Sequence, residues 1–279
     1  KESCFALHGG TAINLFVRDM PRLSVDIDLT YVPIEERSAT LKNIESALNR
    51  ISSRVRRVVQ GSRAEHRVPK GKLLVSTKRA SIKIEVNLVG RGTICEPEEK
   101  VLCERAQQEY GVFGLAKIVP FAQLYGGKMC AALDRQHPRD LFDIKKLLEN
   151  EGVDDELMRG FLLCLSGCDR PIHEVLAPKF LDQKSAFTNK FAGMSLEAFT
   201  YAEYEATRKS LVSVVMDNLS DEMRAYLVKL KEANPDWSRY DFRDFPAIKW
   251  KLKNLVNLRN RDREKHQRQV DALKRVLEV

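Results

Sequence analysis

Polar and apolar residues alternate in two segments before residue 90. Residues 23–29 read Leu-Ser-Val-Asp-Ile-Asp-Leu, so a strand here carries apolar side chains on one face and polar side chains on the other. Residues 81–89 repeat the alternation and place Lys83, Glu85 and Asn87 on one face. Another strand is expected over residues 72–77. The pattern predicts a small sheet in the first half of the chain.

Apolar residues recur at helical spacing over most of the remaining chain. Pro138 is expected to start a new helix at its first position, with Asp140 in the first turn. Helices are expected over residues 12–17, 35–60, 98–109, 117–134 and 139–150, and almost throughout from residue 153, ending in one amphipathic helix after Pro246. We therefore predict an α+β fold, with a domain containing a small mixed sheet at residues 1–150 and an α-helical domain at residues 151–279.

The composition is that of an ordinary globular protein, with 43% hydrophobic and 31% charged residues in 279. No apolar run approaches the roughly 18 residues that cross a membrane, so we expect no membrane partner. Six cysteines form no CxxC pair, which fits a reducing cytoplasm and disfavours a zinc site. Cys164 and Cys168 lie one helical turn apart in an apolar stretch and are expected to be buried thiols. The chain opens without Met or an apolar signal segment and runs straight into a motif. We therefore expect a cytoplasmic protein whose natural N-terminus lies further upstream.

Positive charge is concentrated in two segments of a chain whose net charge is +8. Residues 50–83 hold eleven Lys and Arg against one acid, and residues 249–279 hold ten against four. The first imbalance favours a polyanionic partner such as RNA over a solvated face, whereas both interpretations stay open for the second. Arg54, Arg56 and Arg57 are the candidate RNA-binding residues.

Asp26 and Asp28 are the strongest chemical signal in the sequence. Carboxylates at positions i and i+2 of a strand project from one face about 6–7 Å apart, and they repel each other unless a cation neutralises them. Mg²⁺ prefers carboxylate and phosphate oxygens, so the pair suggests a metal–nucleotide site. Glu85 would be a third acid that allows a second metal. An exposed edge strand with two solvated acids is the alternative.

A glycine turn opens the short helix expected at residues 12–17. Backbone N–H groups of Gly9, Gly10 and Thr11 can approach a phosphate closely, because glycine lacks a Cβ and the helix dipole favours an anion. A tight turn without a ligand explains the same residues, so this signal is weak alone.

Three motifs in order resemble those of a known family. Residues 7–12 read Leu-His-Gly-Gly-Thr-Ala, residues 24–29 read Ser-Val-Asp-Ile-Asp-Leu, and residues 128–144 carry the pattern Lys…Ala-Leu…Arg…Arg-Asp-Leu…Asp. The first two resemble the nucleotidyltransferase fold of DNA polymerase beta and its relatives. All three together resemble the AbiEii/MenT-like toxins of bacterial toxin–antitoxin and abortive-infection systems. The motifs cover residues 1–150, and residues 246–252 are similar less specifically.

The resemblance implies a nucleotidyltransferase that uses an NTP with Mg²⁺ or Mn²⁺ and transfers NMP to an acceptor. In MenT-like members the acceptor is the 3′ end of tRNA, which blocks translation, and a cognate antitoxin is implied as a partner. The residues carried over are the metal ligands Asp26, Asp28 and Glu85, the catalytic residues Asp26, Asp28, Lys128 and Asp143, and the nucleotide-binding residues Gly9, Gly10, Thr11, Ser24 and Arg135.

The resemblance also implies roles for the third motif. Lys128 and Arg135 would neutralise triphosphate charge as pyrophosphate leaves, and Asp143 would orient the attacking hydroxyl or position Lys128. Without the family, these charges are explained by a solvated helix face.

Two alternatives stay open. The same chemistry can act on a small molecule, such as an aminoglycoside, or on a protein hydroxyl, although a small acceptor needs no basic stretch of this length. A non-catalytic module on the same fold can bind RNA or a partner protein. The intact Asp26, Asp28, Lys128 and Asp143 weigh against that module.

Overall fold

Contacts between Cα atoms divide the chain into two compact units, one up to Pro120 and one from Phe121 onward. The structure is a computed structural model that describes residues 2–67 and 70–279. Lys1 of the N-terminal segment and residues 68–69 of the basic stretch lie outside the described residues. The predicted domain boundary at residue 150 follows two helices that group with the second unit. As a division into domains, that boundary stays a prediction.

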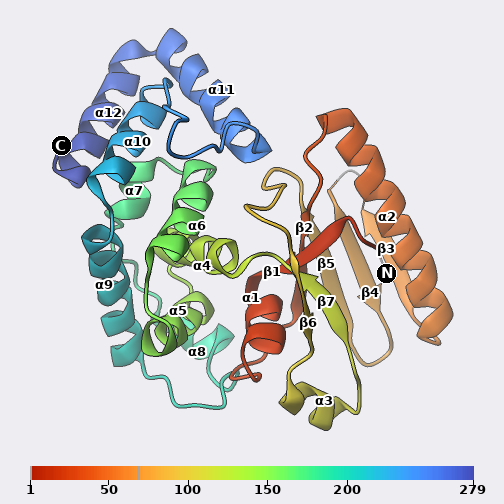
Figure 1. The fold of residues 1–279 in the computed structure, drawn as a ribbon. Helices are drawn as coiled ribbons and strands as arrows, with labels where there is room; N and C mark the ends of the chain where they lie inside the picture. The colour runs from red at the N-terminus through yellow and green to blue at the C-terminus, as the bar shows by residue number, and fades with distance from the viewer. Residues whose placement is uncertain (1, 68–69) are drawn as a thin grey trace. The chain divides into compact units, whose positions relative to one another are not determined.

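The first unit is built on a seven-stranded sheet with the order β3-β4-β5-β2-β1-β7-β6 (Figure 1). Its strands are β1 (Phe5–His8), β2 (Asp26–Tyr31), β3 (Arg63–Arg67), β4 (Lys72–Ser76), β5 (Ser81–Asn87), β6 (Glu98–Val101) and β7 (Leu115–Ile118). The pairs β2–β5 and β1–β7 are parallel, and the other neighbours are antiparallel. The predicted mixed sheet and α+β class are confirmed.

One face of this sheet packs against the helix α2 (Arg37–Val58), which runs alongside the strands in Figure 1. Ile44 and Leu48 of α2 are buried in one core cluster with Leu73 of β4 and Ile84 of β5. Because successive side chains of a strand point to opposite faces, the polar residues of β2 and β5 lie on the other face.

Strand β2 begins at Asp26 rather than at the predicted Leu23. Its parallel neighbour β5 pairs with it only from Asp26 onward, so residues 23–25 have no ladder to join. Leu23 and Val25 are exposed for this reason, although the alternation predicts them on the buried face. Only Ile27 and Leu29 of the predicted apolar face pack against the core.

The described residues contain four strands that the sequence does not predict, namely β1, β3, β6 and β7. The predicted helix at residues 98–109 is wrong in its first part, because residues 98–101 form β6 and the helix α3 spans Glu104–Tyr110. β6 pairs with a neighbour on one side only, and its sequence Glu-Glu-Lys-Val lacks the apolar alternation of a half-buried strand. The helix predicted from residue 117 begins at Phe121, because residues 115–118 pair as β7.

The second unit is helical. Its helices are α4 (Phe121–Arg135), α5 (Pro138–Asn150), α6 (Asp155–Ser166), α7 (Ile172–Leu176), α8 (Lys184–Lys190), α9 (Tyr201–Asp217), α10 (Asp221–Lys231), α11 (Pro246–Arg261) and α12 (Arg263–Leu277). The helix start at Pro138 is confirmed. The single last helix that the sequence predicts is divided at Asp262, whose side chain accepts a hydrogen bond from the backbone N–H of Lys265 and caps α12. Among the described residues, no helix is long and apolar enough to cross a membrane.

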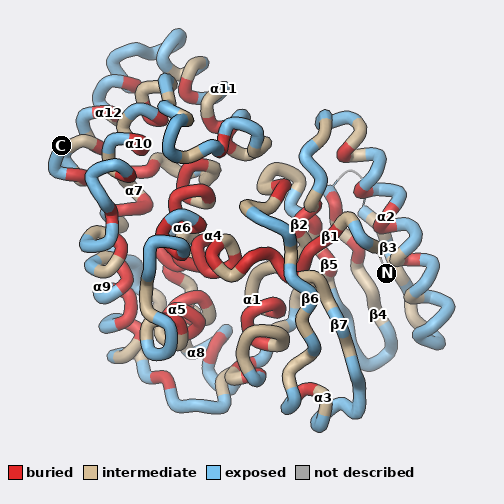
Figure 2. The backbone as a smooth tube through the Cα atoms, viewed as in Figure 1, coloured by how far each residue is buried: buried red, intermediate tan, exposed pale blue. Residues whose placement is uncertain are grey.

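Helices α4 and α6 cross through glycines, and Figure 2 colours both as largely buried. A Cβ on Gly126 would collide with the backbone of Gly160 and Phe161. The thiol of Cys164 lies in this contact, 3.7 Å from the carbonyl oxygen of Gln123, and burial raises its pKa to about 12. Cys164 and Cys168 are half-buried and Cys95 is exposed, so the predicted buried thiols are confirmed only in part.

Candidate active site

The polar face of the sheet brings ionisable residues of four neighbouring strands into one row. In the strand register Asp28 of β2 lies beside Glu85 of β5 on one side and beside His8 of β1 on the other. Glu85 lies in turn beside Lys72 of β4. The register therefore joins acids and bases that are far apart in the sequence.

Two lysines hold the carboxylate of Glu85. Lys72 Nζ lies 2.9 Å from its Oε1 and Lys83 Nζ lies 3.0 Å from its Oε2. Lys83 Nζ also lies 3.7 Å from Asp26 Oδ2. Burial acts to raise the pKa of Glu85, but the hydrogen bonds from both lysines lower it below its ordinary value. The hydrogen bond to Glu85 raises the pKa of Lys83. Glu85 is therefore an ionised and paired group.

The turn after β1 lies against the acid strand. Gly9 opens the helix α1 (Gly9–Ala12) with φ of +73°, and a Cβ on it would lie 2.7 Å from Oδ2 of Asp28. A Cβ on Gly10 would lie 2.9 Å from Nη2 of Arg22 and 3.0 Å from Oγ of Ser24. The missing side chains thus let the backbone of the turn approach three polar groups closely.

Hydrogen bonds fix this turn against the start of β2. Thr11 is buried, and its Oγ1 lies 3.0 Å from Ser24 Oγ and donates to the carbonyl oxygen of Asp26. Asn14, in the π-helical stretch η1 (Ile13–Val17), donates from Nδ2 to the carbonyl oxygen of Gly10 at 2.9 Å. The structure therefore brings together the nucleotide-binding residues expected in this unit, which are Gly9, Gly10, Thr11 and Ser24.

Asp26 and Asp28 fit a divalent cation that also binds phosphate. Both carboxylates belong to the polar face of one strand, and Gly9 keeps the space beside Asp28 free of a side chain. Mg²⁺ commonly takes one or two carboxylates and completes its shell with substrate phosphates and water. Within residues 2–67 and 70–279, no group of three or more His, Cys, Asp and Glu side chains is arranged to hold a metal alone. The remaining ligands would therefore come from the substrate.

Sequence reasoning missed Arg22 and the role of Lys72. Arg22 is buried, and its Nη1 donates to the carbonyl oxygen of Leu23 at 2.8 Å, which holds the guanidinium near Gly10. No spacing rule marks an arginine before a strand as part of a site. Lys72 counted only toward the basic stretch, because the sequence does not state which strand lies beside which.

The second unit holds a lysine–aspartate cluster, which consists of Lys128 and Arg135 of α4 and Asp140 and Asp143 of α5. Lys128 Nζ lies 2.8 Å from Asp140 Oδ1 and 3.1 Å from Asp143 Oδ2. Arg135 Nε lies 2.6 Å from Asp140 Oδ2. The side chains of Lys128, Asp140 and Asp143 are buried, with that of Lys128 only 6% exposed. The side chain of Arg135 is 61% exposed. Asp140 therefore links a buried cation to an exposed one.

Neighbouring charges and burial set the protonation states of Asp140 and of the nearby His137. Burial alone would raise the pKa of Asp140, but Lys128 and Arg135 hold it well below its ordinary range. At the start of α5, His137 Nδ1 accepts a hydrogen bond from the backbone N–H of Arg139 at 3.2 Å. Burial lowers the pKa of His137 to about 4, so the ring stays a neutral acceptor near neutral pH. Asp140, which the sequence marks only as a first-turn residue, is the centre of the cluster.

The basic stretch is spread over several elements. Arg54, Arg56 and Arg57 lie exposed near the end of α2. Arg56 also donates from Nη2 to Ser52 Oγ at 2.8 Å and to the carbonyl oxygen of Ala64 at 3.2 Å, which ties it to β3. The candidate RNA-binding residues thus share one helix end, while Lys72 and Lys83 belong to the polar row of the sheet.

Comparison with known proteins places this arrangement in a family. A model of the family described as "Nucleotidyl transferase AbiEii toxin, Type IV TA system" matches residues 1–254. Among solved structures, the chain is similar to MenT4, a nucleotidyltransferase toxin from Mycobacterium tuberculosis H37Rv, with a TM-score of 0.58 and 14% sequence identity. That likeness covers 91% of this chain and 85% of the other, and at this identity it shows the fold alone. No curated protein matches the chain.

The family match runs through all three motifs and most of the helical unit. It confirms the resemblance that the motifs indicate and the nucleotidyltransferase activity. The chain therefore belongs to the AbiEii family of nucleotidyltransferase toxins from type IV toxin–antitoxin systems.

Proposed function

We propose that this toxin transfers NMP from an NTP to the 3′ end of tRNA, in a reaction that requires Mg²⁺ or Mn²⁺. The observation that carries the proposal is the position of Asp26 and Asp28 on one strand face, against the turn at Gly9 and Gly10. Two carboxylates and a backbone turn without side chains offer what a metal–triphosphate needs, namely anionic ligands for the cation and N–H donors for phosphate oxygens.

In the first unit, Asp26 and Asp28 would hold the cation while the turn holds the triphosphate. A bound Mg²⁺ supplies a Lewis acid that polarises phosphoryl oxygens and offsets the charge of the leaving pyrophosphate. Ser24 and Arg22 lie beside Gly10, where hydroxyl and guanidinium donors can bind phosphate oxygens. Thr11 already bonds to the backbone of the acid strand, so its role is to position the turn.

For the lysine–aspartate cluster we propose the neutralisation of triphosphate charge as pyrophosphate leaves. Arg135 is exposed and carries its charge at the surface, whereas Lys128 is buried between two carboxylates. Asp143 lies 3.1 Å from Lys128 Nζ, which favours the positioning of that lysine over activation of the attacking hydroxyl.

The tRNA acceptor is supported by charge as well as by the family. Three exposed arginines gather near the end of α2, in a stretch of eleven basic residues and one acid. An RNA backbone that contacts them releases counterions, so binding weakens as salt rises. A small acceptor contacts fewer charges, so its binding would depend less steeply on salt.

A type IV toxin–antitoxin family implies a cognate antitoxin. We propose that it is a protein encoded beside the toxin, and that it counters the block of translation that modified tRNA ends cause.

The acceptor is tested with tRNA whose 3′-terminal ribose is either intact or opened by periodate. Purified protein is incubated with each α-³²P-labelled NTP, Mg²⁺ and one of the two tRNAs, and the products are separated on a denaturing gel. We expect label on intact tRNA and none on oxidised tRNA. Equal label on both would overturn the 3′-end assignment, and label on protein or on a small molecule would move the acceptor to another class.

A matched pair of variants tests the contribution of the basic helix end. Arg54→Gln/Arg57→Gln removes two charges there, and Arg239→Gln/Arg243→Gln removes two exposed charges from the second unit. We expect the first pair of substitutions to weaken tRNA binding. The slope of the logarithm of the binding constant against the logarithm of the salt concentration should become shallower by about one per lost phosphate contact. Equal effects of both pairs would argue against a specific RNA surface on α2.

A further inference from the structure

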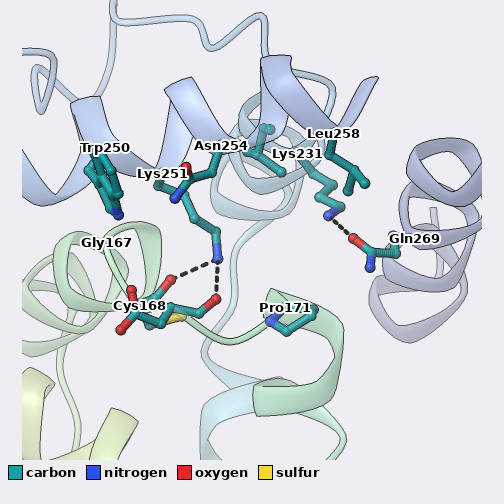
Figure 3. A pocket seen from close by; sticks show the side chains of 11 residues that line it. Gly167, Cys168, Pro171, Lys231, Trp250, Lys251, Asn254, Leu258 and Gln269 are labelled. Atoms are coloured by element: carbon teal, nitrogen blue, oxygen red, sulfur yellow. Dashed lines mark hydrogen bonds between the residues drawn. The ribbon is translucent and has the colours of Figure 1, made fainter. Parts of the chain in front are cut away.

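A pocket of about 140 Å³ lies among the last helices of the second unit (Figure 3). Its walls come from the segment between α6 and α7, the end of α10, and the helices α11 and α12. The sequence motif at residues 246–252, which the proposed function leaves unused, contributes Trp250 and Lys251. The pocket therefore gives that motif a structural context.

Two lysines of this pocket are almost completely buried. Lys231 is 2% exposed and Lys251 is 7% exposed. Lys251 Nζ donates to the carbonyl oxygens of Cys168 and Arg170 at 2.7 and 2.8 Å, and Lys231 Nζ donates to Oε1 of Gln269 at 2.5 Å. Figure 3 shows the ammonium group of Lys251 at Cys168 and that of Lys231 at Gln269.

These hydrogen-bond partners are all neutral. In the part of the chain that the structure describes, neither lysine forms a salt bridge with a carboxylate within 4.0 Å. Burial, together with the nearby charge of Lys251, lowers the pKa of Lys231 to about 8, although the carboxylate of Glu174 acts to raise it. Asp169 also lines the pocket, and its carboxylate interacts with Lys251. Among the described residues, no carboxylate lies within 4.0 Å of Lys231 Nζ. A buried charge without such a partner is destabilising, so the pocket favours an anion beside Lys231.

The donors of the two lysines indicate different roles. An ammonium group has three N–H donors, and Lys231 uses one of them on Gln269. Lys251 directs its donors to the carbonyl oxygens after α6, including that of Asp169 at 3.4 Å. Lys231 thus keeps N–H donors for an anion, whereas Lys251 would contribute only its charge from a fixed position.

The wall beside these lysines suits a nucleobase. Trp250 is 49% exposed and lines the pocket together with the exposed Asn254. A nucleobase can stack on an aromatic ring, and an amide can bond to a base edge or a ribose hydroxyl. Lys253 Nζ lies 5.7 Å from the Trp250 ring centroid and adds positive charge at the same wall.

We propose that this pocket binds a nucleoside 5′-monophosphate group, as a free nucleotide or at the 5′ end of an RNA, with its phosphate on Lys231 and its base against Trp250. Phosphate oxygens form charge-assisted hydrogen bonds with ammonium groups, and the small volume suits the phosphate while the base stays at the wall. The proposal uses none of the candidate catalytic residues and does not depend on the identity of the acceptor.

Fluorescence of Trp250 tests the proposal at the site itself. The chain has two tryptophans, so Trp237→Phe leaves Trp250 as the single reporter in the full-length protein. AMP, the dinucleotide pUpU and its unphosphorylated form UpU are titrated in EDTA at constant ionic strength. We expect a saturable change with AMP or pUpU and at least tenfold weaker binding of UpU. Binding of AMP but not pUpU assigns the free nucleotide, and binding of pUpU assigns an RNA end.

Two matched pairs of variants in that background locate the phosphate. Lys231→Met should weaken binding at least tenfold, whereas Lys229→Met, an exposed lysine of the same helix, should leave it unchanged. Asn254→Asp adds an acid to the pocket wall at an exposed position, and should weaken binding severalfold without affecting folding. Asn257→Asp, exposed on the same helix, is its control.

The proposal is overturned if neither AMP nor pUpU changes the fluorescence in a saturable way. It is also overturned if pUpU binds and UpU binds as tightly, because the phosphate is then not recognised. Equal affinities in Asn254→Asp and Asn257→Asp would contradict it even if Lys231→Met failed to fold.

Discussion

Gly9 and Asp28 lie so close that a Cβ on Gly9 would come within 2.7 Å of the carboxylate Oδ2. Gly9 also has φ of +73°, a conformation that side-chain-bearing residues rarely adopt. Gly9→Ala should therefore displace either the turn or the carboxylate. We expect nucleotide transfer to fall about 100-fold or more, since displacements near 1 Å have effects of this size.

Gly61 provides the control for this substitution. It has the same φ of +73°, but nothing lies within 4 Å of its Cβ position. Gly61→Ala therefore imposes the backbone strain alone, about 1 kcal/mol of stability, and should leave the transfer rate intact. Similar rates for Gly9→Ala and the wild type would show that the turn does not need its approach to Asp28.

The lysines on Glu85 predict how the enzyme depends on Mg²⁺. Asp28→Asn should raise the Mg²⁺ concentration for half-maximal activity at least tenfold, because a proposed metal ligand is lost. Glu85→Gln should change it less than twofold, because Lys72 and Lys83 already hold this carboxylate. The measurement is a Mg²⁺ titration of the initial rate for each variant. A tenfold rise for Glu85→Gln would make Glu85 a third metal ligand.

The position of Asp140 between two cations predicts a large loss of stability on its removal. Asp140→Ala leaves Lys128 buried with one fewer counter-charge, so the free energy of unfolding should fall by about 3–5 kcal/mol. Glu149→Ala removes an exposed carboxylate from Lys145 and Lys146 on the same helix, and should lower it by about 1 kcal/mol or less. Urea denaturation compares the two, and equal losses would contradict the central place of Asp140.

Two adjacent glycines of α4 predict opposite effects of one added methyl group. A Cβ on Gly126 would strike the backbone of α6, so Gly126→Ala should destabilise the protein by about 2–4 kcal/mol. A Cβ on Gly127 would meet only Cys164 Sγ at 3.7 Å, an ordinary contact. Gly127→Ala should therefore be neutral or stabilising by up to about 1 kcal/mol. Thermal unfolding measures both, and a stable Gly126→Ala variant would show that the crossing of α4 and α6 can widen.

The sequence predicts those parts of the fold whose signal is local. Alternation in β2 and β5 assigns Asp26, Asp28 and Glu85 to polar strand faces, because the period of two is a property of each strand. β6 is not predicted, because a short charged edge strand depends on its partner β7 rather than on its own pattern. The break at Asp262 is missed for a related reason, since apolar residues continue at helical spacing on both sides of it.

In the candidate site, too, the sequence predicts the residues whose signal is local. The glycine turn and the two aspartates are visible within each motif. The lysines on Glu85 are not, because their contacts depend on the pairing of β4, β5 and β2. The pairing of Asp140 with Lys128 and Arg135 likewise arises only when α4 and α5 pack together. Residues that act through tertiary neighbours are thus harder to assign from sequence than residues that act through their own backbone.

Transfer of label from NTP tests the central claim most directly. The wild type and the Asp26→Ala/Asp28→Ala variant are each incubated with tRNA, Mg²⁺ and NTP labelled with ³²P at either the α or the γ position. We predict that the wild type transfers the α label and not the γ label, and that the variant, still folded by circular dichroism, transfers neither. Transfer of the α label by the variant, or of the γ label by the wild type, would contradict nucleotidyl transfer at Asp26 and Asp28.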